Sequence, residues 1–290
     1  MDYICIYYIK KYSIGCDKLV NNIKFAELFG FMLGDGWLSL HDNSKGSLCY
    51  NCGFSGDEKS LQNVINDLKT LFGENIGTAR IRTYSTSSDK YSIKGSTTEV
   101  SLNTKIAKTF LQFGMPIGKR VEQDYSIPDW IVNGTLEIKI AFISGVYAAE
   151  GYTPKMQSNN KNPRVLGFNM SKRKTIGCSN LVKQFSKILD DIGIEYNIKI
   201  EEIFTKDLNE KFRFEFCNST ENVFYISSIL KLNYCIEKQQ KMLLLNEYMK
   251  YKLSILNNPL SEKYNPNART KRKCSNLKTF DEYVVDLKLR

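Results

Sequence analysis

Two apolar segments of the chain carry small residues at every fourth position. The first, FAELFGFMLGDG, covers residues 25–36, and the second, IAFISGVYAAEG, covers residues 140–151. They align without a gap at an offset of 115 residues, and each predicts a helix with one stripe of small side chains. Interior glycine costs a helix about 1 kcal/mol relative to alanine, so we expect the two stripes to pack against each other. The stripes contain Ala26, Gly30 and Gly34 in the first helix and Ala141, Gly145 and Ala149 in the second.

Each of these predicted helices ends on an acidic residue followed by glycine. The acids are Asp35 and Glu150, and the glycines are Gly36 and Gly151. We expect both glycines to adopt the left-handed conformation that is common at helix C-termini. If the helices pack as predicted, the two carboxylates lie side by side at the negative ends of both helix dipoles, next to free backbone carbonyls. Such a concentration of oxygen ligands favours a hard divalent cation such as Mg²⁺.

The hydrophobic pattern that follows each of these helices is also repeated. The first copy predicts two strands in 36–55, a helix at 58–73, strands at 78–85 and 97–103, and a helix at 104–114. The second copy predicts two strands in 151–169, a helix at 178–193, strands at 196–204 and 212–218, and a helix at 220–230. The sequence therefore predicts an α+β fold of two pseudo-symmetric αββαββα repeats. We expect the first repeat in residues 1–120, a linker in 121–134, the second repeat in 135–255, and a basic C-terminal tail in 256–290 that ends in a short helix.

The charge of the chain favours a polyanionic partner. There are 41 basic and 31 acidic residues, which gives a formal net charge of +10. Basic side chains alternate with apolar ones along the predicted strands, so that one face of each sheet is positively charged. Strands of this kind can enter the major groove of DNA and read base edges. The residues that we expect to contact DNA are Lys45, Arg80, Arg82, Lys94, Lys155, Arg164, Lys199, Lys211 and Arg213.

Other residue types exclude several classes of protein. No run of about 18 apolar residues is present, so we expect no membrane helix. The single histidine, His41, lies in a polar stretch, which argues against Ser–His–Asp and histidine-based zinc hydrolysis. A CxxC at residues 49–52 lacks two further zinc ligands at a matching spacing. Any hydrolytic chemistry must therefore rest on carboxylates, lysines and a metal.

A second nuclease pattern has to be weighed against the paired helices. The letters PD at 128–129 and EIK at 137–139 spell the PD…ExK arrangement. That chemistry needs its acids on adjoining strands. Here the second group runs directly into the helix at 140–151, so the pattern does not fit.

LFGFMLGDG (residues 28–36) and ISGVYAAEG (residues 143–151) resemble the two motif copies of the LAGLIDADG homing endonuclease family, in its monomeric, double-motif form. The resemblance covers roughly residues 20–250. It implies a DNA-binding β-saddle beneath the motif helices, with Asp35 and Glu150 as the catalytic acids that bind metal. Backbone oxygens of Gly34 and Ala149 are further candidate ligands.

The resemblance also implies a basic residue near each centre, after the last helix of each repeat. In GMPIGKRVEQ the candidate is Lys119, with Arg120 as its alternative, and in LNYCIEKQQK it is Lys238. Ser55 and Asn169 occupy the places of a polar residue that positions water, although glutamine is commoner there.

The resemblance implies a site-specific endonuclease that cuts both strands of a long asymmetric DNA target and leaves short 3′ overhangs. We expect it to act as a monomer with Mg²⁺, for which Mn²⁺ would substitute. Two alternatives stay open: an RNA maturase that binds its host intron RNA, and a non-catalytic DNA-binding regulator. The presence of both acids favours the nuclease. No intein splice junction is evident, so we expect an intron-encoded protein. The many Lys, Asn, Ile and Tyr residues suggest an AT-rich coding sequence, from which we expect a mitochondrion or another organelle.

Overall fold

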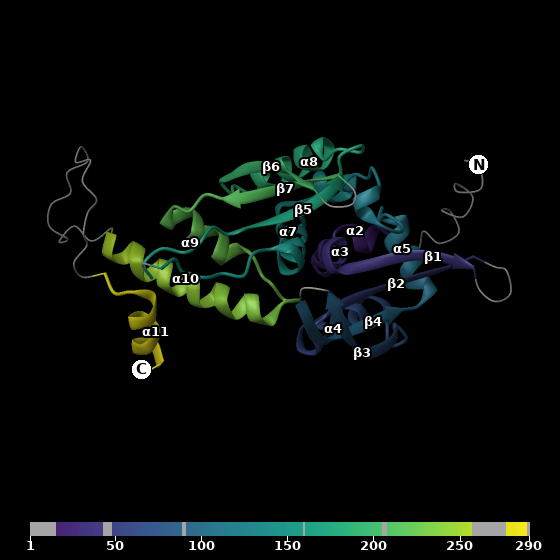
Figure 1. The fold of residues 1–290 in the computed structure, drawn as a ribbon, viewed down its shortest axis with the longest axis horizontal. Helices are drawn as coiled ribbons and strands as arrows, with labels where there is room; N and C mark the ends of the chain where they lie inside the picture. Colours follow the sequence, from purple (N-terminus) through teal and green to yellow (C-terminus); the bar gives the residue numbers. More distant parts are fainter. Residues whose placement is uncertain are drawn as a thin grey trace.

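The computed structural model describes residues 16–42, 48–88, 91–158, 160–204, 208–256 and 277–288. Figure 1 shows a central pair of helices, α3 (Ile23–Asp35) and α7 (Leu136–Glu150), with one antiparallel sheet on either side. Among the described helices, none combines the length and the apolar character needed to cross a membrane.

The first repeat has the predicted order of elements. Its segments are α2 (Cys16–Val20), α3, β1 (Gly36–Asp42), β2 (Leu48–Gly56), α4 (Glu58–Phe72), β3 (Gly77–Ser88), β4 (Tyr91–Leu102) and α5 (Thr104–Gln112). The predicted linker contains η1 (Arg120–Glu122) and α6 (Asp129–Val132). The second repeat comprises α7, β5 (Gly167–Arg173), α8 (Ser179–Asp191), β6 (Tyr196–Phe204), β7 (Leu208–Phe216) and α9 (Thr220–Ile229). The long helix α10 (Ile236–Leu256), which was not predicted, follows α9 within the range expected for the second repeat. Helix α11 (Phe280–Lys288) forms the predicted helix in the tail. The division into domains stays a prediction.

The second repeat departs from the predicted strand pair at 151–169. Only β5 forms there, so its sheet has three strands in the order β5–β7–β6, whereas the first sheet has four in the order β1–β2–β4–β3. The described residues of the segment 152–164, which exclude residue 159, form a loop closed by an isolated bridge between Met156 and Pro163. The prediction of two strands was wrong here because Pro154 and Pro163 lack the N–H that a ladder requires.

This loop at 152–164 is held by the C-terminal helices. Lys252 of α10 donates to Asn162 Oδ1 at 2.7 Å, and the backbone N–H of Phe280 in α11 donates to the carbonyl of Asn160 at 2.8 Å. The side chain of Asn160 also donates to Asp281 at 2.5 Å. Helix α11 is fixed on α10 by a cluster of aromatic rings that contains Tyr248, Tyr251, Phe280 and Tyr283.

The two glycine stripes pack against each other as predicted. A Cβ atom added to Gly30 would lie 2.2 Å from the carbonyl oxygen of Phe142, and one added to Gly145 would lie 2.0 Å from that of Glu27. One added to Gly34 would lie 2.3 Å from the Cβ of Ala149. These separations leave no room for side chains, so the backbones of α3 and α7 are in direct contact.

The conformation predicted for the glycines that follow the two acids was wrong. Gly36 has φ −96° and Gly151 has φ −71°, and both are extended. The chain therefore passes from each helix directly into the next segment without a left-handed cap. Glycine is still needed, because a Cβ at Gly36 would lie 2.5 Å from Met32 Cγ and one at Gly151 would lie 2.3 Å from the carbonyl oxygen of Tyr147.

Adding one methyl group within the stripes should strongly destabilise the protein. We expect Gly30→Ala and Gly145→Ala each to lower the free energy of unfolding by about 1–3 kcal/mol or more, because the added carbon meets backbone atoms that cannot move aside. Urea unfolding measures this. Gly56→Ala is the matched control, since its Cβ would meet only Leu61 side-chain atoms at 3.6 Å and beyond. Equal effects at all three positions would contradict the close packing.

Candidate metal and nucleic-acid site

The carboxylates of Asp35 and Glu150 meet at the ends of the two packed helices. Each acid is the last residue of its helix, and a Cβ on Gly34 would lie 3.0 Å from Glu150 Cγ. The side chain of Asp35 is open to solvent and that of Glu150 is half-buried. The surrounding protein nevertheless removes enough water to raise the pKa of both carboxyls, and the charge of Asp35 raises the pKa of Glu150 further.

One basic side chain reaches the end of each motif helix. Lys238 Nζ donates to the carbonyls of Ala148 at 2.8 Å and Ala149 at 3.0 Å, at the C-terminus of α7. Arg120 donates to the carbonyls of Met32, Gly34 and Gly36 around the C-terminus of α3. Both cations favour the ionised forms of the two acids and so oppose the rise in their pKa. They also bind the free carbonyls at the negative ends of the helix dipoles.

The structure brings Arg120, and not the preferred candidate Lys119, to this centre. The side chain of Lys119 is 78% exposed and lies 3.4 Å from Glu122. Adjacent residues of a short turn point in different directions, and the sequence alone does not fix which of the two faces the helix end. Lys238 lies at the corresponding place in the second repeat, as expected.

Ser55 and Asn169 occupy corresponding places beside the acids. Gly36, which follows Asp35, pairs with Phe54, and Gly151, which follows Glu150, forms a bridge to Phe168. Ser55 and Asn169 come directly after these two pairing partners. Asn169 also makes a hydrogen bond with the Tyr152 side chain. The water-positioning role of Ser55 and Asn169 stays a prediction.

The donor set at the two helix ends fits a hard divalent cation. Asp35 and Glu150 supply two carboxylates, and the carbonyls of Gly34 and Ala149 lie beside them. Each carbonyl has two lone pairs, so it can accept from Arg120 or Lys238 and still face a cation. Within the described parts of the chain, no group of three or more His, Cys, Asp or Glu side chains could hold a metal. The remaining ligands would therefore be water or phosphate oxygens, which is usual for Mg²⁺.

The strands of the second sheet present basic side chains opposite the core. Phe212 and Phe214 of β7 are buried against Phe185 of α8, which leaves Lys211 and Arg213 on the other face. Arg213 pairs in register with Lys199, and Lys211 lies close enough to Glu150 to lower its pKa.

This basic face is partly neutralised by acids. Arg213 forms an ion pair with Glu201 at 2.6 Å, and Lys199 forms one with Glu215 at 2.7 Å.

The remaining predicted DNA contacts are spread over loops and the first sheet. Lys155 and Arg164 are exposed in the loop at 152–164, and Arg80 is exposed on β3. Arg82 and Lys94 lie on β3 and β4, but their side chains, like the whole of Lys45, lie outside the described residues.

Three buried or half-buried polar residues, two beside Arg120 and one on α3, were not predicted. Tyr125 lies beside Arg120, and burial raises its pKa to about 12. Lys172 lies 3.5 Å from the centroid of the Tyr125 ring and is only 2% exposed. The sequence gives a signal for Lys172, because it lies two residues after Met170 and four after Phe168, on the same face of one strand as these apolar residues. Glu27 is likewise the one acid before Asp35 in an otherwise apolar helix segment.

The PD…ExK pattern finds no support in the structure. Asp129 begins α6 and Glu137 lies in the first turn of α7, so neither is on a strand. Lys139 forms an ion pair with Asp191 at 2.7 Å, on the side of α8.

Parts of several known proteins are similar in sequence to this chain. No family model matches the chain. The replication factor C small subunit of Methanocaldococcus jannaschii is 28% identical over 261 residues, or 87% of this chain and 13% of that protein. The tRNA-splicing ligase RtcB of Methanopyrus kandleri is 30% identical over 60% of this chain and 18% of its own length. The RNA polymerase subunit Rpo1N of M. jannaschii is 30% identical over 61% of this chain and 13% of its own length. The chain thus spans less than a fifth of these curated relatives.

Solved structures similar to this chain include the homing endonuclease I-DmoI in complex with DNA and Ca, with a TM-score of 0.47 and 17% identity. The match covers 78% of this chain and 97% of that one. The meganuclease I-SmaMI bound to uncleavable DNA gives a TM-score of 0.44 and 13% identity, over 79% of this chain and 91% of that one. The LAGLIDADG homing endonuclease I-GzeII in complex with its DNA target gives a TM-score of 0.44 and 11% identity, over 79% of this chain and 90% of that one.

Replacing either acid by its amide should stabilise the metal-free protein. A raised pKa means that the folded state binds the proton more tightly than the unfolded state, so ionisation costs stability as pH rises through the folded pKa. We therefore expect Asp35→Asn and Glu150→Gln to unfold at higher temperature than the wild type at pH 8, with a smaller difference at pH 5. Thermal unfolding with a chelator present measures this, and less stable amide variants at pH 8 would contradict it.

Divalent cations should stabilise the wild type and have little effect on a variant that lacks both carboxylates. A cation that binds only the folded state raises the unfolding temperature, and the increase grows with the logarithm of its concentration divided by its Kd. We expect Ca²⁺ to raise the unfolding temperature of the wild type and to have little effect on the Asp35→Asn/Glu150→Gln double variant. An equal shift in both proteins would place the cation elsewhere.

Proposed function

We infer that the chain is a double-motif member of the LAGLIDADG homing endonuclease family, and we propose that it is a divalent-metal-dependent DNA endonuclease. The observation that carries this proposal is the meeting of Asp35 and Glu150 at the ends of two helices whose backbones touch. Two carboxylates with raised pKa in one small volume repel each other, and a cation between them relieves that repulsion. A binding protein without a reaction to perform has no need of this arrangement.

Double-stranded DNA is the partner that the charge supports best. The net charge is +10, and Lys199, Lys211 and Arg213 lie on the sheet face opposite the core. Lys211 is close to Glu150, so a phosphate held on this face lies near the acids. The surface ion pairs of Arg213 and Lys199 are weak enough to exchange for phosphate contacts.

The residues of the site have separable roles in this proposal. Asp35 and Glu150, with the carbonyls of Gly34 and Ala149, hold Mg²⁺, for which Mn²⁺ substitutes. When bound, the metal polarises the scissile phosphate and activates water. Arg120 and Lys238 hold the carbonyls at the helix ends and offer positive charge to the phosphate, while Ser55 and Asn169 orient water.

With one acid and one cation in each repeat, each repeat serves one DNA strand. Because the two repeats differ in sheet size and in their acids, the target is long and asymmetric and a monomer suffices to bind it. The break leaves short 3′ overhangs, as in the family that the motifs resemble.

The sequence relatives support a module that is independent of any one host activity. Matching segments lie within proteins named as a replication factor subunit, a tRNA-splicing ligase and an RNA polymerase subunit. A segment found in three proteins with such different names does not account for the different activities that these names describe. Such a distribution fits a mobile endonuclease carried within host genes, and its intron-encoded origin stays a prediction.

Loss of either acid should slow cleavage strongly. We expect Asp35→Asn and Glu150→Gln each to slow double-strand cleavage by about a hundredfold or more with Mg²⁺, because loss of a metal ligand costs more than the 10- to 100-fold typical of its outer-shell partners. The assay uses a target selected from a randomised duplex library. Tight binding of an intron transcript by a wild-type protein that cuts no DNA with Mg²⁺ or Mn²⁺ would favour the maturase instead.

The two adjacent basic residues should differ in their effect. We expect Arg120→Met to slow cleavage strongly and Lys119→Met to leave the rate nearly unchanged, because Arg120 alone reaches the end of α3. Single-turnover cleavage with saturating protein separates the rate from DNA affinity. The reverse order of effects would return the role to Lys119.

A further inference from the structure

Arg120 lies on a connecting segment that crosses to the opposite repeat, and Lys238 lies in the first turn of α10, directly after such a segment. Residues 230–236 leave α9 of the second repeat, contact α3 and α4 of the first, and lead into Lys238. Residues 119–128 follow α5 of the first repeat, contain Arg120, and contact β5 and α8 of the second. Each cation therefore acts on its own repeat, while the segment that carries it or leads to it is held by the other repeat.

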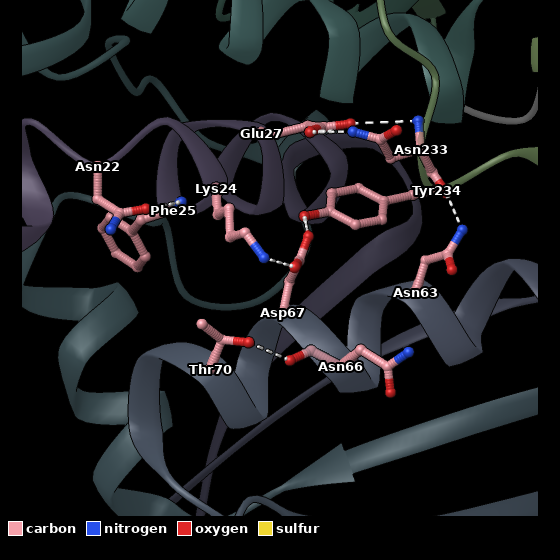
Figure 2. A network of polar contacts seen from close by, with 10 residues as sticks. All are labelled: Asn22, Lys24, Phe25, Glu27, Asn63, Asn66, Asp67, Thr70, Asn233 and Tyr234. Carbon is pink, nitrogen blue, oxygen red and sulfur yellow. Dashed lines mark hydrogen bonds and ion pairs between the residues drawn. The ribbon is translucent and has the colours of Figure 1, made fainter.

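The first crossing is held by a buried carboxylate. Glu27 of α3 is 4% exposed, and its two oxygens accept from the backbone N–H of Asn233 at 3.2 Å and from the Asn233 side chain at 2.9 Å (Figure 2). The Asn63 side chain of α4 donates to the carbonyl of Asn233 at 2.7 Å (Figure 2). All three hydrogen bonds are made with side chains of the first repeat, and together they fix the backbone and the side chain of Asn233 in the crossing segment.

Neighbouring contacts extend the same attachment. Tyr234 donates to Asp67 at 2.9 Å, and Asp67 also forms an ion pair with Lys24 (Figure 2). Ile236 is the first residue of α10, and its N–H donates to the Ser60 hydroxyl of α4 at 3.0 Å. Lys238 follows two residues later, so its direction toward α7 is set by the way in which α10 begins.

The second crossing is held by a buried lysine. Lys172 of β5 donates to the carbonyl of Arg120 at 2.7 Å and to that of Gln123, with its ammonium over the ring of Tyr125. Further along, the Gln184 side chain of α8 accepts from Ile127 N–H at 2.7 Å and donates to its carbonyl at 3.1 Å. Lys172 thus binds the backbone of the very residue whose guanidinium reaches the end of α3.

These two buried charges are not copies of one another. When the two motif helices are aligned at their offset of 115 residues, Glu27 corresponds to Phe142. Lys172 lies on a strand and not on a motif helix. Burying a charge is costly unless it is fully hydrogen-bonded, and apolar side chains would fill the same space at lower cost. What apolar side chains would not do is fix a peptide group in one position and direction.

We propose that each repeat positions the cation of the other: Glu27 holds the segment that directs Lys238, and Lys172 holds the segment that directs Arg120. This rests on the proposed function insofar as the two cations serve different strands. Glu27 and Lys172 are then positioning residues, and each controls the centre that belongs to the opposite repeat. Loss of one of them slows cleavage of one strand and leaves the other strand nearly unaffected.

The variants Glu27→Gln and Lys172→Met test this with little change in volume. In Glu27→Gln an NH₂ group replaces one acceptor oxygen and faces an N–H group of Asn233. In Lys172→Met the hydrogen bonds to the carbonyls of Arg120 and Gln123 are both lost. The matched controls are Glu74→Gln and Lys187→Met, which make the same changes at exposed ion pairs on the first and second repeats. Unfolding temperatures are measured first, and all rates are compared well below them.

Strand-resolved cleavage is the main readout. We expect Glu27→Gln to slow one strand on the order of tenfold or more and Lys172→Met to slow the opposite strand, since displacement by about 1 Å can cost up to a hundredfold. Nicked product should accumulate with opposite polarity in the two variants. Equal slowing of both strands, or a bias of the same polarity in both variants, overturns the proposal.

Hydrogen exchange gives a readout that does not depend on cleavage. We expect faster exchange at residues 230–238 in Glu27→Gln and at 119–127 in Lys172→Met, each without change in the other segment. If the wild type cuts no DNA, the proposed function fails, and this measurement alone decides the cross-positioning. Unchanged exchange in both segments overturns it.

The pH dependence distinguishes positioning from a general loss of stability. Burial raises the pKa of Glu27 to about 7, with Asp67 of α4 raising it further and Asn233 and Lys24 lowering it. Protonation turns one acceptor into a donor that faces the Asn233 N–H groups. The ratio of the two strand rates should therefore change more in the wild type than in Glu27→Gln as pH falls through about 7. A constant ratio in the wild type contradicts the role of Glu27.

Discussion

The direct contact between the backbones of α3 and α7 is the constraint on which the rest of the structure depends. Gly30 faces the carbonyl of Phe142 and Gly145 faces that of Glu27, at distances that exclude even a methyl group. Helices packed through larger side chains are 8–10 Å apart between axes. Only this closer approach brings the last residues of the two helices, Asp35 and Glu150, into one small volume.

That volume concentrates like charges, and the chain compensates for them with Arg120 and Lys238. Each cation satisfies several carbonyls at the end of one helix and lowers the pKa of both acids, against a larger effect of lost hydration that raises it. The metal-free site is therefore held together by its own cations. The ionised carboxylates are still less stable there than in water, and this is the electrostatic condition under which an added divalent ion is bound most readily.

Much of this arrangement could be predicted from the sequence because it depends on periodicity. The spacing of Gly30 and Gly34 and the gapless repeat gave the packed helices, the paired acids and the α+β repeats. The missing strand of the second repeat depends on Pro154 and Pro163, which the prediction passed over. The choice between Lys119 and Arg120 depends on the direction of side chains in a three-residue turn, where no periodicity exists. Glu27 and Lys172 act on peptides distant in the chain, and a single sequence does not pair them.

The loop at 152–164 lacks a strand partner and is fastened instead to α10 and α11 through Lys252, Asn160 and Phe280. The corresponding stretch of the first repeat is a paired hairpin, β1 with β2. A loop fastened in this way loses its conformational entropy when the protein folds and not when a ligand arrives. In the proposed complex with DNA, the contacts that Lys155 and Arg164 make from this loop are therefore pre-organised by α10 and α11, and loss of α11 would weaken binding to the part of the DNA that this loop faces.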